Sequence, residues 1–171
     1  MKRIAIIGPG GAGKSTLARQ LGQALGLPVF HLDRLFWRPG WVETPREEWA
    51  QKQRDVLQAH DGWIMDGNYG GTLEVRLAAA DTIIFLDFSP WVCLPRVVWR
   101  YFQNIGRSRP DMAPGCDEKL DLAFILFVAR YRREKAPRIR QRLKALPPEV
   151  QVLRFRTPRE LRKFLRAKLI D

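Results

Sequence analysis

Apolar and polar positions along the chain follow two recurring patterns, and the first predicts strands. Continuous apolar runs at residues 3–8 and 81–87 are typical of strands covered on both faces. Shorter runs at residues 28–33 and 62–67 are bounded by Gly or Pro, and each carries an aspartate at or near its end. Residues 150–155 roughly alternate, which predicts an edge strand. Five strands are therefore expected.

The second pattern is helical and lies between these strands. Residues 14–25 place leucines and alanine at helical spacing. The segment "TPREEW" at 44–49 predicts a helix with Thr44 as N-cap in a capping box, and "TPREL" at 157–161 repeats the device. Ser89-Pro90 predicts a further helix start, with Pro95 expected to kink that helix or delay it. Alternation of strands and helices predicts a three-layer α/β fold with a parallel sheet.

Length and composition limit the chain to one class of protein. The 171 residues suffice for a single domain, residues 1–171, and 46% hydrophobic residues are in the globular range. The longest apolar run, residues 122–129, is less than half of what crosses a bilayer. Cys93 and Cys116 stand far apart, without the spacing of a disulfide framework or a zinc site. We therefore expect a cytoplasmic protein with no membrane partner.

The positive charge is confined to one half of the chain. Residues 1–89 hold ten Lys/Arg and ten Asp/Glu, whereas residues 90–171 hold twenty and eight, so the formal net charge of +12 lies in the second half. Such a half is expected to face phosphates, nucleic acid or another anionic surface. The basic segment 130–144 is interpreted mainly as a solvated helix face, with a nucleic-acid patch as the alternative.

The segment "GPGGAGKST" at residues 8–16 matches the P-loop pattern GxxxxGK[ST] at every fixed position. It follows an apolar strand and opens a helix, as the chemistry requires, because inward-pointing backbone N–H groups and the helix N-terminus together bind phosphate. Lys14 is expected to reach the β- and γ-phosphates, and the Ser15 hydroxyl to ligate Mg²⁺. The predicted nucleotide-binding residues are Gly8, Gly10, Gly11, Ala12, Gly13, Lys14, Ser15 and Thr16. ATP and Mg²⁺ are the expected cofactors.

The wider pattern indicates a small kinase. The chain has no NKxD signature of a GTPase and is short for a helicase or an AAA-type machine. The order of "GPGGAGKST", "WIMDGNY" and a late arginine-rich segment resembles the nucleoside monophosphate kinase superfamily, adenylate kinase included. More narrowly, "HLDRLFWRPGW", "DGNYGGT" and "GRSRPDMAPGCDEKLD" resemble the DNA topology modulation proteins, which are adenylate kinase-like. The resemblance implies a sheet in the order 2-3-1-4-5, an acceptor-binding flap at about residues 34–62 and a lid at about 104–120.

The acceptor side is expected around the second and third strands. Asp33 ends the second strand and is interpreted as the base for an acceptor hydroxyl, since related kinases place an acidic residue near this point. Arg34 and Arg38 are candidates for binding an anionic acceptor. Trp37 and Trp41 are candidates for its wall, although the aromatic residues here would equally form the core of the flap.

The resemblance also favours Asp66 over Asp87 as the carboxylate that serves Mg²⁺, although Asp87 after "IIFL" fits a Walker B pattern. Adenylate kinases continue with Phe-Pro-Arg-Thr at this point, whereas this chain has Asn68-Tyr69-Gly70-Gly71-Thr72. The usual arginine is missing, so Asn68 and Arg76 become the candidates for binding the acceptor.

In the lid, Arg107 and Arg109 are expected to clamp the transferring phosphoryl group, and Arg100 is a further candidate. His31 and His60 have no partner at a recognisable spacing and are interpreted as structural.

Two functions remain open at this point. The first is an ATP- and Mg²⁺-dependent phosphotransferase that acts on a small acceptor, a nucleotide among the candidates. The second is a nucleotide-dependent regulatory or nucleic-acid-binding protein with little kinase activity. For the first, any binding of nucleic acid should be weak and non-specific.

Overall fold

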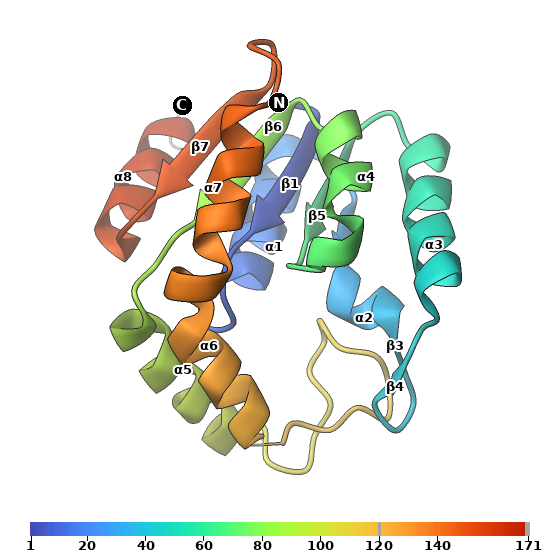
Figure 1. Ribbon diagram of the computed structural model, residues 1–171, viewed down its shortest axis with the longest axis vertical. Coiled ribbons are helices and arrows are strands. Elements are labelled where there is room, and N and C mark those ends of the chain that lie inside the picture. Colours follow the sequence, from blue (N-terminus) through green and yellow to red (C-terminus); the bar gives the residue numbers. More distant parts are fainter. Residues whose placement is uncertain (120, 170–171) are drawn as a thin grey trace.

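In the computed structural model, which describes residues 1–119 and 121–169, five parallel strands form a central sheet (Figure 1). The strands are β1 (Arg3–Ile7), β2 (Val29–His31), β5 (Trp63–Asp66), β6 (Thr82–Leu86) and β7 (Gln151–Phe155), in the order β2-β5-β1-β6-β7. The labels depart from the expected 2-3-1-4-5 because β3 and β4 lie outside this sheet. Numbered on their own, the five strands run 2-3-1-4-5.

Helices cover both faces of the sheet and give the expected three-layer α/β architecture. Apolar residues of α1 (Lys14–Leu25) and α8 (Pro158–Leu169) pack on one face. Those of α3 (Arg46–Ala59), α4 (Leu73–Ala79) and α7 (Ala136–Lys144) pack on the other. Two further helices, α5 (Pro90–Gln103) and α6 (Leu122–Glu134), lie side by side below the carboxyl ends of the strands in Figure 1. No helix within the described residues is long and apolar enough to cross a bilayer.

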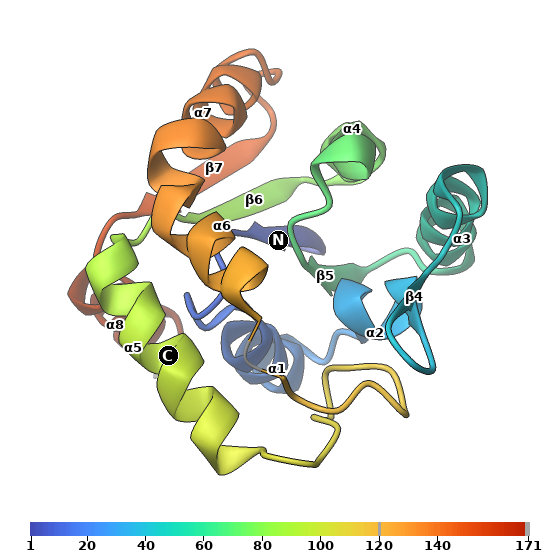
Figure 2. The ribbon, with the colours of Figure 1, turned by 60° about the horizontal axis from the view of Figure 1, so that its bottom comes forward.

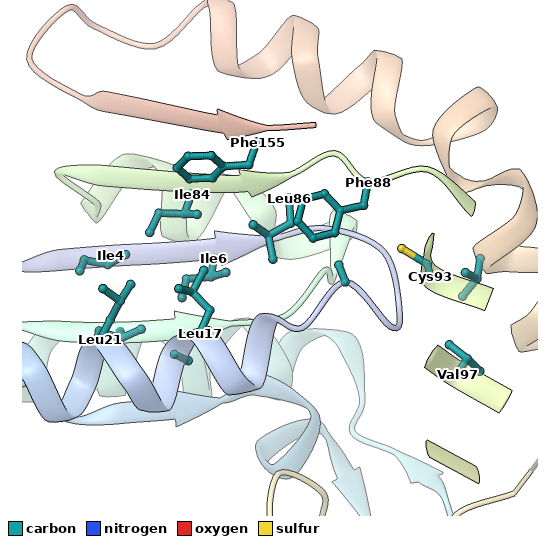
Figure 3. Close-up of a cluster of buried hydrophobic side chains, with 14 residues drawn as sticks. Ile4, Ile6, Leu17, Leu21, Ile84, Leu86, Phe88, Cys93, Val97 and Phe155 are labelled. Carbon is teal, nitrogen blue, oxygen red and sulfur yellow. The ribbon is translucent and has the colours of Figure 1, made fainter. Parts of the chain in front are cut away.

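The two sides of β1 show how the sheet is buried on both faces. Ile4 and Ile6 point to one side, where they pack with residues of α1 such as Leu17 (Figure 3). Ala5 and Ile7 belong to the cluster on the opposite side. All four β1 residues have no exposed surface. Successive side chains of a strand point to opposite faces, so a segment buried on both sides is apolar throughout, as residues 4–7 of β1 are, whereas Arg3 at its start is exposed.

Two segments project from the carboxyl edge of the sheet. The flap, residues 34–62, contains a short antiparallel ribbon of β3 (Trp37–Arg38) and β4 (Val42–Glu43), entered through α2 (Leu32–Phe36). The lid, residues 104–120, joins α5 to α6 and is closed by bridges between Ile105 and Glu118 and between Ser108 and Asp117. Leu120 lies outside the described residues. Figure 2 shows the lid passing beside α2 and the flap ribbon.

Several local predictions can be compared with the structure. Ser89 caps α5, accepting a hydrogen bond from the Trp91 N–H, and the helix continues through Pro95 without a delayed start. Thr157 accepts from the Glu160 N–H at the start of α8, as predicted. The capping box at Thr44 is wrong, because α3 begins at Arg46 and the Thr44 hydroxyl donates to the Phe36 carbonyl instead. That bond joins the residue after β4 to the residue before β3, at the base of the flap ribbon.

Candidate active site

The P-loop connects β1 to α1 and takes the conformation that phosphate binding requires. Gly11 and Gly13 have φ values of 76° and 91°, a left-handed region that only glycine adopts without strain. A Cβ on Gly11 would lie 2.4 Å from the Cys93 carbonyl oxygen of α5, whereas one on Gly13 would meet nothing within 4 Å. Packing against α5 therefore explains Gly11, and backbone conformation alone explains Gly13. The Lys14 ammonium donates to the Pro9 carbonyl at 2.9 Å, across the mouth of the loop.

A carboxylate from the neighbouring strand meets the P-loop at Ser15. The Ser15 hydroxyl donates to Asp66 Oδ2 at 2.8 Å, and Asp66 Oδ1 lies 2.5 Å from His31 Nδ1. The alternative carboxylate, Asp87, is buried and paired with Arg154 of β7. The geometry thus favours Asp66 over Asp87 as the partner of the P-loop hydroxyl. His31 was expected to have only a structural role, yet it orients this carboxylate.

Asp33 lies between the P-loop and the lid. It belongs to the first turn of α2 and does not end β2 as predicted, because β2 stops at His31. The Tyr69 hydroxyl donates to Asp33 Oδ1 at 2.7 Å. Removal from water raises the pKa of Asp33, while the positive charge of Lys14 and the Tyr69 hydrogen bond oppose the rise. Burial lowers the pKa of Lys14, and the charge of Asp33 opposes that change. The two groups therefore share one electrostatic environment.

Acidic residues of the lid hold two arginines in place, Arg109 of the lid and Arg100 of α5. Glu118 accepts from Arg109 Nε at 2.6 Å and from Arg100 Nε at 2.9 Å, and Asp111 accepts from Arg109 Nη1 at 2.8 Å. Burial and the neighbouring charge of Arg109 lower the pKa of Arg100. Burial would raise the pKa of Asp111, but Arg109 and the nearby Ser15 hydroxyl hold that pKa below its usual value. Two guanidinium groups thus lie together near the P-loop.

The flap and the lid touch each other, and we call this set of interactions the flap–lid contact. The Gly40 N–H donates to the Gly115 carbonyl at 3.0 Å, and Trp41 Nε1 donates to the Asp117 carbonyl at 3.2 Å. Trp41 has a φ of 64°, which is unusual for a bulky side chain and consistent with a functional constraint. An apolar cluster completes the contact; it consists of Met112, Ala113 and Cys116 from the lid with Trp37 and Trp41 from the flap.

These parts enclose one cavity of about 1220 Å³. Its polar wall includes Lys14, Asp33 and Arg109, and its volume exceeds that of an ordinary small-ligand pocket. The P-loop residues from Gly10 to Thr16 line it, together with Trp37 and Asn68. Gly8, the first residue of the predicted set, does not line the cavity and packs against Leu86 of β6. The Asn68 amide oxygen accepts from the Gly8 N–H at 3.2 Å and from the Tyr131 hydroxyl at 2.9 Å, so this side chain also fixes the start of the P-loop.

Four predicted arginines do not line the cavity. Arg34 is exposed on α2, Arg38 is exposed in the flap and Arg107 is exposed in the lid. Arg76 was expected to bind the acceptor, but it is fully buried and donates to the carbonyls of Gly67, Asn68 and Tyr69. That expectation is wrong, because every contact of its guanidinium is to the backbone of the loop that follows β5. Arg76 holds this loop, and with it the Tyr69 side chain.

The sequence interpretation missed four residues of the site: His31, Tyr69, Asp111 and Glu118. His31, Tyr69 and Glu118 act through hydrogen bonds to residues distant in sequence, so no spacing pattern marks them. Asp111 pairs with Arg109, two residues before it. A faint signal existed for Asp111 and Glu118, since acidic residues are interleaved with the lid arginines.

Comparison with known proteins agrees with this geometry. The chain is 33% identical over 154 residues to a shikimate kinase of Rhodococcus erythropolis, covering 81% of this chain and 86% of that one. The chain belongs to the family of P-loop kinases that includes shikimate kinase. No protein-family model matches it. The broad resemblance to kinases of the nucleoside monophosphate kinase type is thereby confirmed, whereas these comparisons do not show the narrower resemblance to the DNA topology modulation proteins.

Solved structures of the same fold include other small-molecule kinases. Shikimate kinase from Bacteroides thetaiotaomicron superposes with a TM-score of 0.58 at 20% identity, covering 99% of both chains. A gluconokinase from Sinorhizobium meliloti superposes with a TM-score of 0.56 at 17% identity, covering 99% of this chain and 90% of that one. At these identities the similarity establishes the fold alone.

Kinases built on a P-loop use ATP and Mg²⁺, and the residues present here fit both. The Ser15 hydroxyl and the Asp66 carboxylate are adjacent oxygen ligands of the kind that Mg²⁺ prefers. The glycine backbone beside Lys14 leaves the open space that a phosphate needs, as the unobstructed Gly13 shows.

Proposed function

We propose that this kinase transfers the γ-phosphoryl group of ATP to a hydroxyl of a small acceptor, within one domain that closes its flap and lid around both substrates. The observation that carries the proposal is the shared cavity, in which a P-loop lysine, a partly buried carboxylate and a lid arginine face one another. A kinase of this type has little covalent chemistry to perform, so positioning and charge stabilisation supply most of the rate.

Each of these side chains has a defined task in the proposed reaction. Lys14 binds the β- and γ-phosphates, and Ser15 with Asp66 would hold Mg²⁺, whose charge offsets that of the phosphates. Asp33 accepts the proton of the attacking hydroxyl as the new oxygen–phosphorus bond forms and ADP leaves. Removal from water raises the pKa of Asp33, which makes the carboxylate a stronger base, and Tyr69 fixes its orientation. Arg109 stabilises the charge that spreads over the phosphoryl oxygens.

The experiment is an assay of ATP-dependent phosphorylation over a panel of small hydroxyl compounds, nucleosides and nucleotides. Lys14→Ala serves as the blank, because it removes the phosphate ligand from an otherwise intact P-loop. Transfer by the wild type that the variant lacks would support the proposal. ATP binding with no transfer to any compound would contradict it.

A second function, the nucleotide-dependent nucleic-acid regulation suggested by the narrower resemblance, is favoured by one observation: twenty Lys/Arg against eight Asp/Glu in residues 90–171. Simple phosphate attraction should give weak, sequence-independent binding whose affinity falls with salt at a log–log slope of about −0.9 per phosphate neutralised. A salt titration on several unrelated duplexes, with and without ATP, separates the two functions. Sequence-selective or ATP-switched binding at physiological salt would favour the regulator.

A further inference from the structure

The acceptor end of the cavity has an unusual balance of charge. Two carboxylates line it, Asp33 from α2 and Glu43 from β4, together with the indole rings of Trp37 and Trp41 and the phenol of Tyr69. Glu43 forms no ion pair within the described part of the chain, so its oxygens are available to a ligand. The walls contributed by the flap are therefore aromatic and acidic.

The arginines of this region are directed elsewhere. Arg38 in the flap is half exposed and pairs with Glu48 at 2.5 Å, and it does not line the cavity. Arg34 is exposed and does not line the cavity, and the guanidinium of Arg76 donates to backbone carbonyls. None of these three guanidinium groups is placed to receive a carboxylate or phosphate of the acceptor, although paired guanidinium N–H groups are the usual partners of such anions.

The cations that line the cavity beside the lid already have partners. Arg109 uses Nε and Nη1 on Glu118 and Asp111, and its task in the proposed function is on the phosphoryl group. Arg100 of α5 uses Nε on the same Glu118. The Lys119 ammonium lies 4.9 Å from the centre of the Trp41 ring, in a cation–π contact. An anionic acceptor would therefore meet cations that are already paired and two carboxylates of its own sign.

We propose that the acceptor is an uncharged polyhydroxy compound, held by Asp33 and Glu43 through its hydroxyls and by Trp37 and Trp41 through its apolar face. The assignment rests on the proposed function and narrows it. Carboxylates accept hydrogen bonds from hydroxyl groups, and aromatic rings pack against the C–H faces of a ring or chain of such carbons. Like-charge repulsion from the same carboxylates excludes acceptors that carry a carboxylate or a phosphate.

The test uses pairs of compounds that differ in one charged group: glucitol and gluconate, adenosine and AMP, and shikimate with its methyl ester. Phosphorylation is measured with saturating ATP, and binding is followed through tryptophan fluorescence. We expect the neutral member of at least one pair to be phosphorylated with a kcat/KM about tenfold or more above that of its anionic partner.

Two variants make the test specific to the acidic wall. Glu43→Gln should reduce the preference for the neutral compound several-fold, because it removes one repelling charge. Glu47→Gln is the matched control, since Glu47 is exposed in the first turn of α3 and does not line the cavity. An equal loss of preference in both variants would overturn the assignment.

The remaining outcomes distinguish failure of the neutral-acceptor assignment from failure of the proposed kinase function. Preferred phosphorylation of anionic acceptors, abolished by Lys119→Ala, would overturn the neutral-acceptor assignment and leave the kinase function standing. Binding of ATP without binding or phosphorylation of any compound would overturn both.

Discussion

Replacement of Arg76 by methionine should damage the fold and the site together. This arginine of α4 is fully buried, and its guanidinium donates to the carbonyls of Gly67 at 2.8 Å, Asn68 at 3.2 Å and Tyr69 at 3.3 Å. Burial lowers its pKa to about 10, so the group is still charged at neutral pH. Its charge is balanced by backbone dipoles. The Tyr69 carbonyl also accepts from the Thr72 N–H at 3.1 Å, so within the described residues the carbonyls of Gly67 and Asn68 are the two that depend on this side chain.

The size of the effect follows from these contacts. Methionine fills much of the same volume without a donor, and each buried carbonyl left without a partner costs about 1–3 kcal/mol. Part of this cost is offset, because methionine has no charge to desolvate and the loop can shift toward water. Two carbonyls lose their partner, so we expect the free energy of unfolding to fall by about 2–4 kcal/mol. For a chain of this size the melting temperature should fall by roughly 4–16 °C.

Urea unfolding followed by circular dichroism measures this loss. Arg133→Met is the control, since that side chain is 80% exposed on α6 and its removal should change stability by no more than about 0.5 kcal/mol. Arg76→Lys should also destabilise the protein, because an ammonium cannot reach three carbonyls as the planar guanidinium does. If the free energy of unfolding of Arg76→Met lies within about 1 kcal/mol of the wild-type value, Arg76 does not anchor this loop.

Three further changes test the proposed site. Lys14→Ala should weaken ATP binding in calorimetric titration and abolish transfer while circular dichroism shows an intact fold; unchanged affinity would remove the P-loop from the mechanism. Asp66→Asn should lower kcat by about tenfold to hundredfold and raise the Mg²⁺ concentration that activity requires. Asp87→Asn should mainly lower the melting temperature, because the partner of Asp87 is Arg154. The reverse pattern would show that Asp87, and not Asp66, serves the metal. Arg109→Ala should lower kcat by about 10³-fold with a smaller effect on ATP affinity. Arg107→Ala should leave steady-state kinetics nearly unchanged, because Arg107 is exposed and does not line the cavity. Equal losses of kcat in the two variants would contradict the assignment of the phosphoryl-binding role to Arg109 alone.

The sequence was most informative where a short segment determines its own conformation. The P-loop has fixed spacing and a required strand–turn–helix context, so its residues could be assigned before the structure. The strands of the sheet could be predicted for a related reason, since a strand buried on both faces has a continuous apolar sequence. These features depend on neighbours within the same few residues.

The flap and lid were harder to predict because their roles depend on contacts across the fold. The sequence around a single arginine does not indicate whether its side chain is exposed to solvent, as that of Arg34 is, or bonded to backbone carbonyls, as that of Arg76 is. His31 gave no signal because its partner Asp66 is on another strand. Thr44 satisfies a local capping pattern, yet its hydroxyl bonds across the flap ribbon, where a tertiary contact replaced the local one.

The flap–lid contact implies that the two substrates cannot bind independently. The flap contributes the walls of the acceptor end, and the lid contributes Arg109 beside the P-loop. A ligand that stabilises either segment in this arrangement stabilises the other through Met112, Cys116 and the two tryptophans. By thermodynamic reciprocity, the acceptor must raise the affinity for ATP by the same factor by which ATP raises the affinity for the acceptor. Couplings of this kind are typically about 5- to 150-fold, so ATP should bind more tightly in the presence of a saturating acceptor than in its absence.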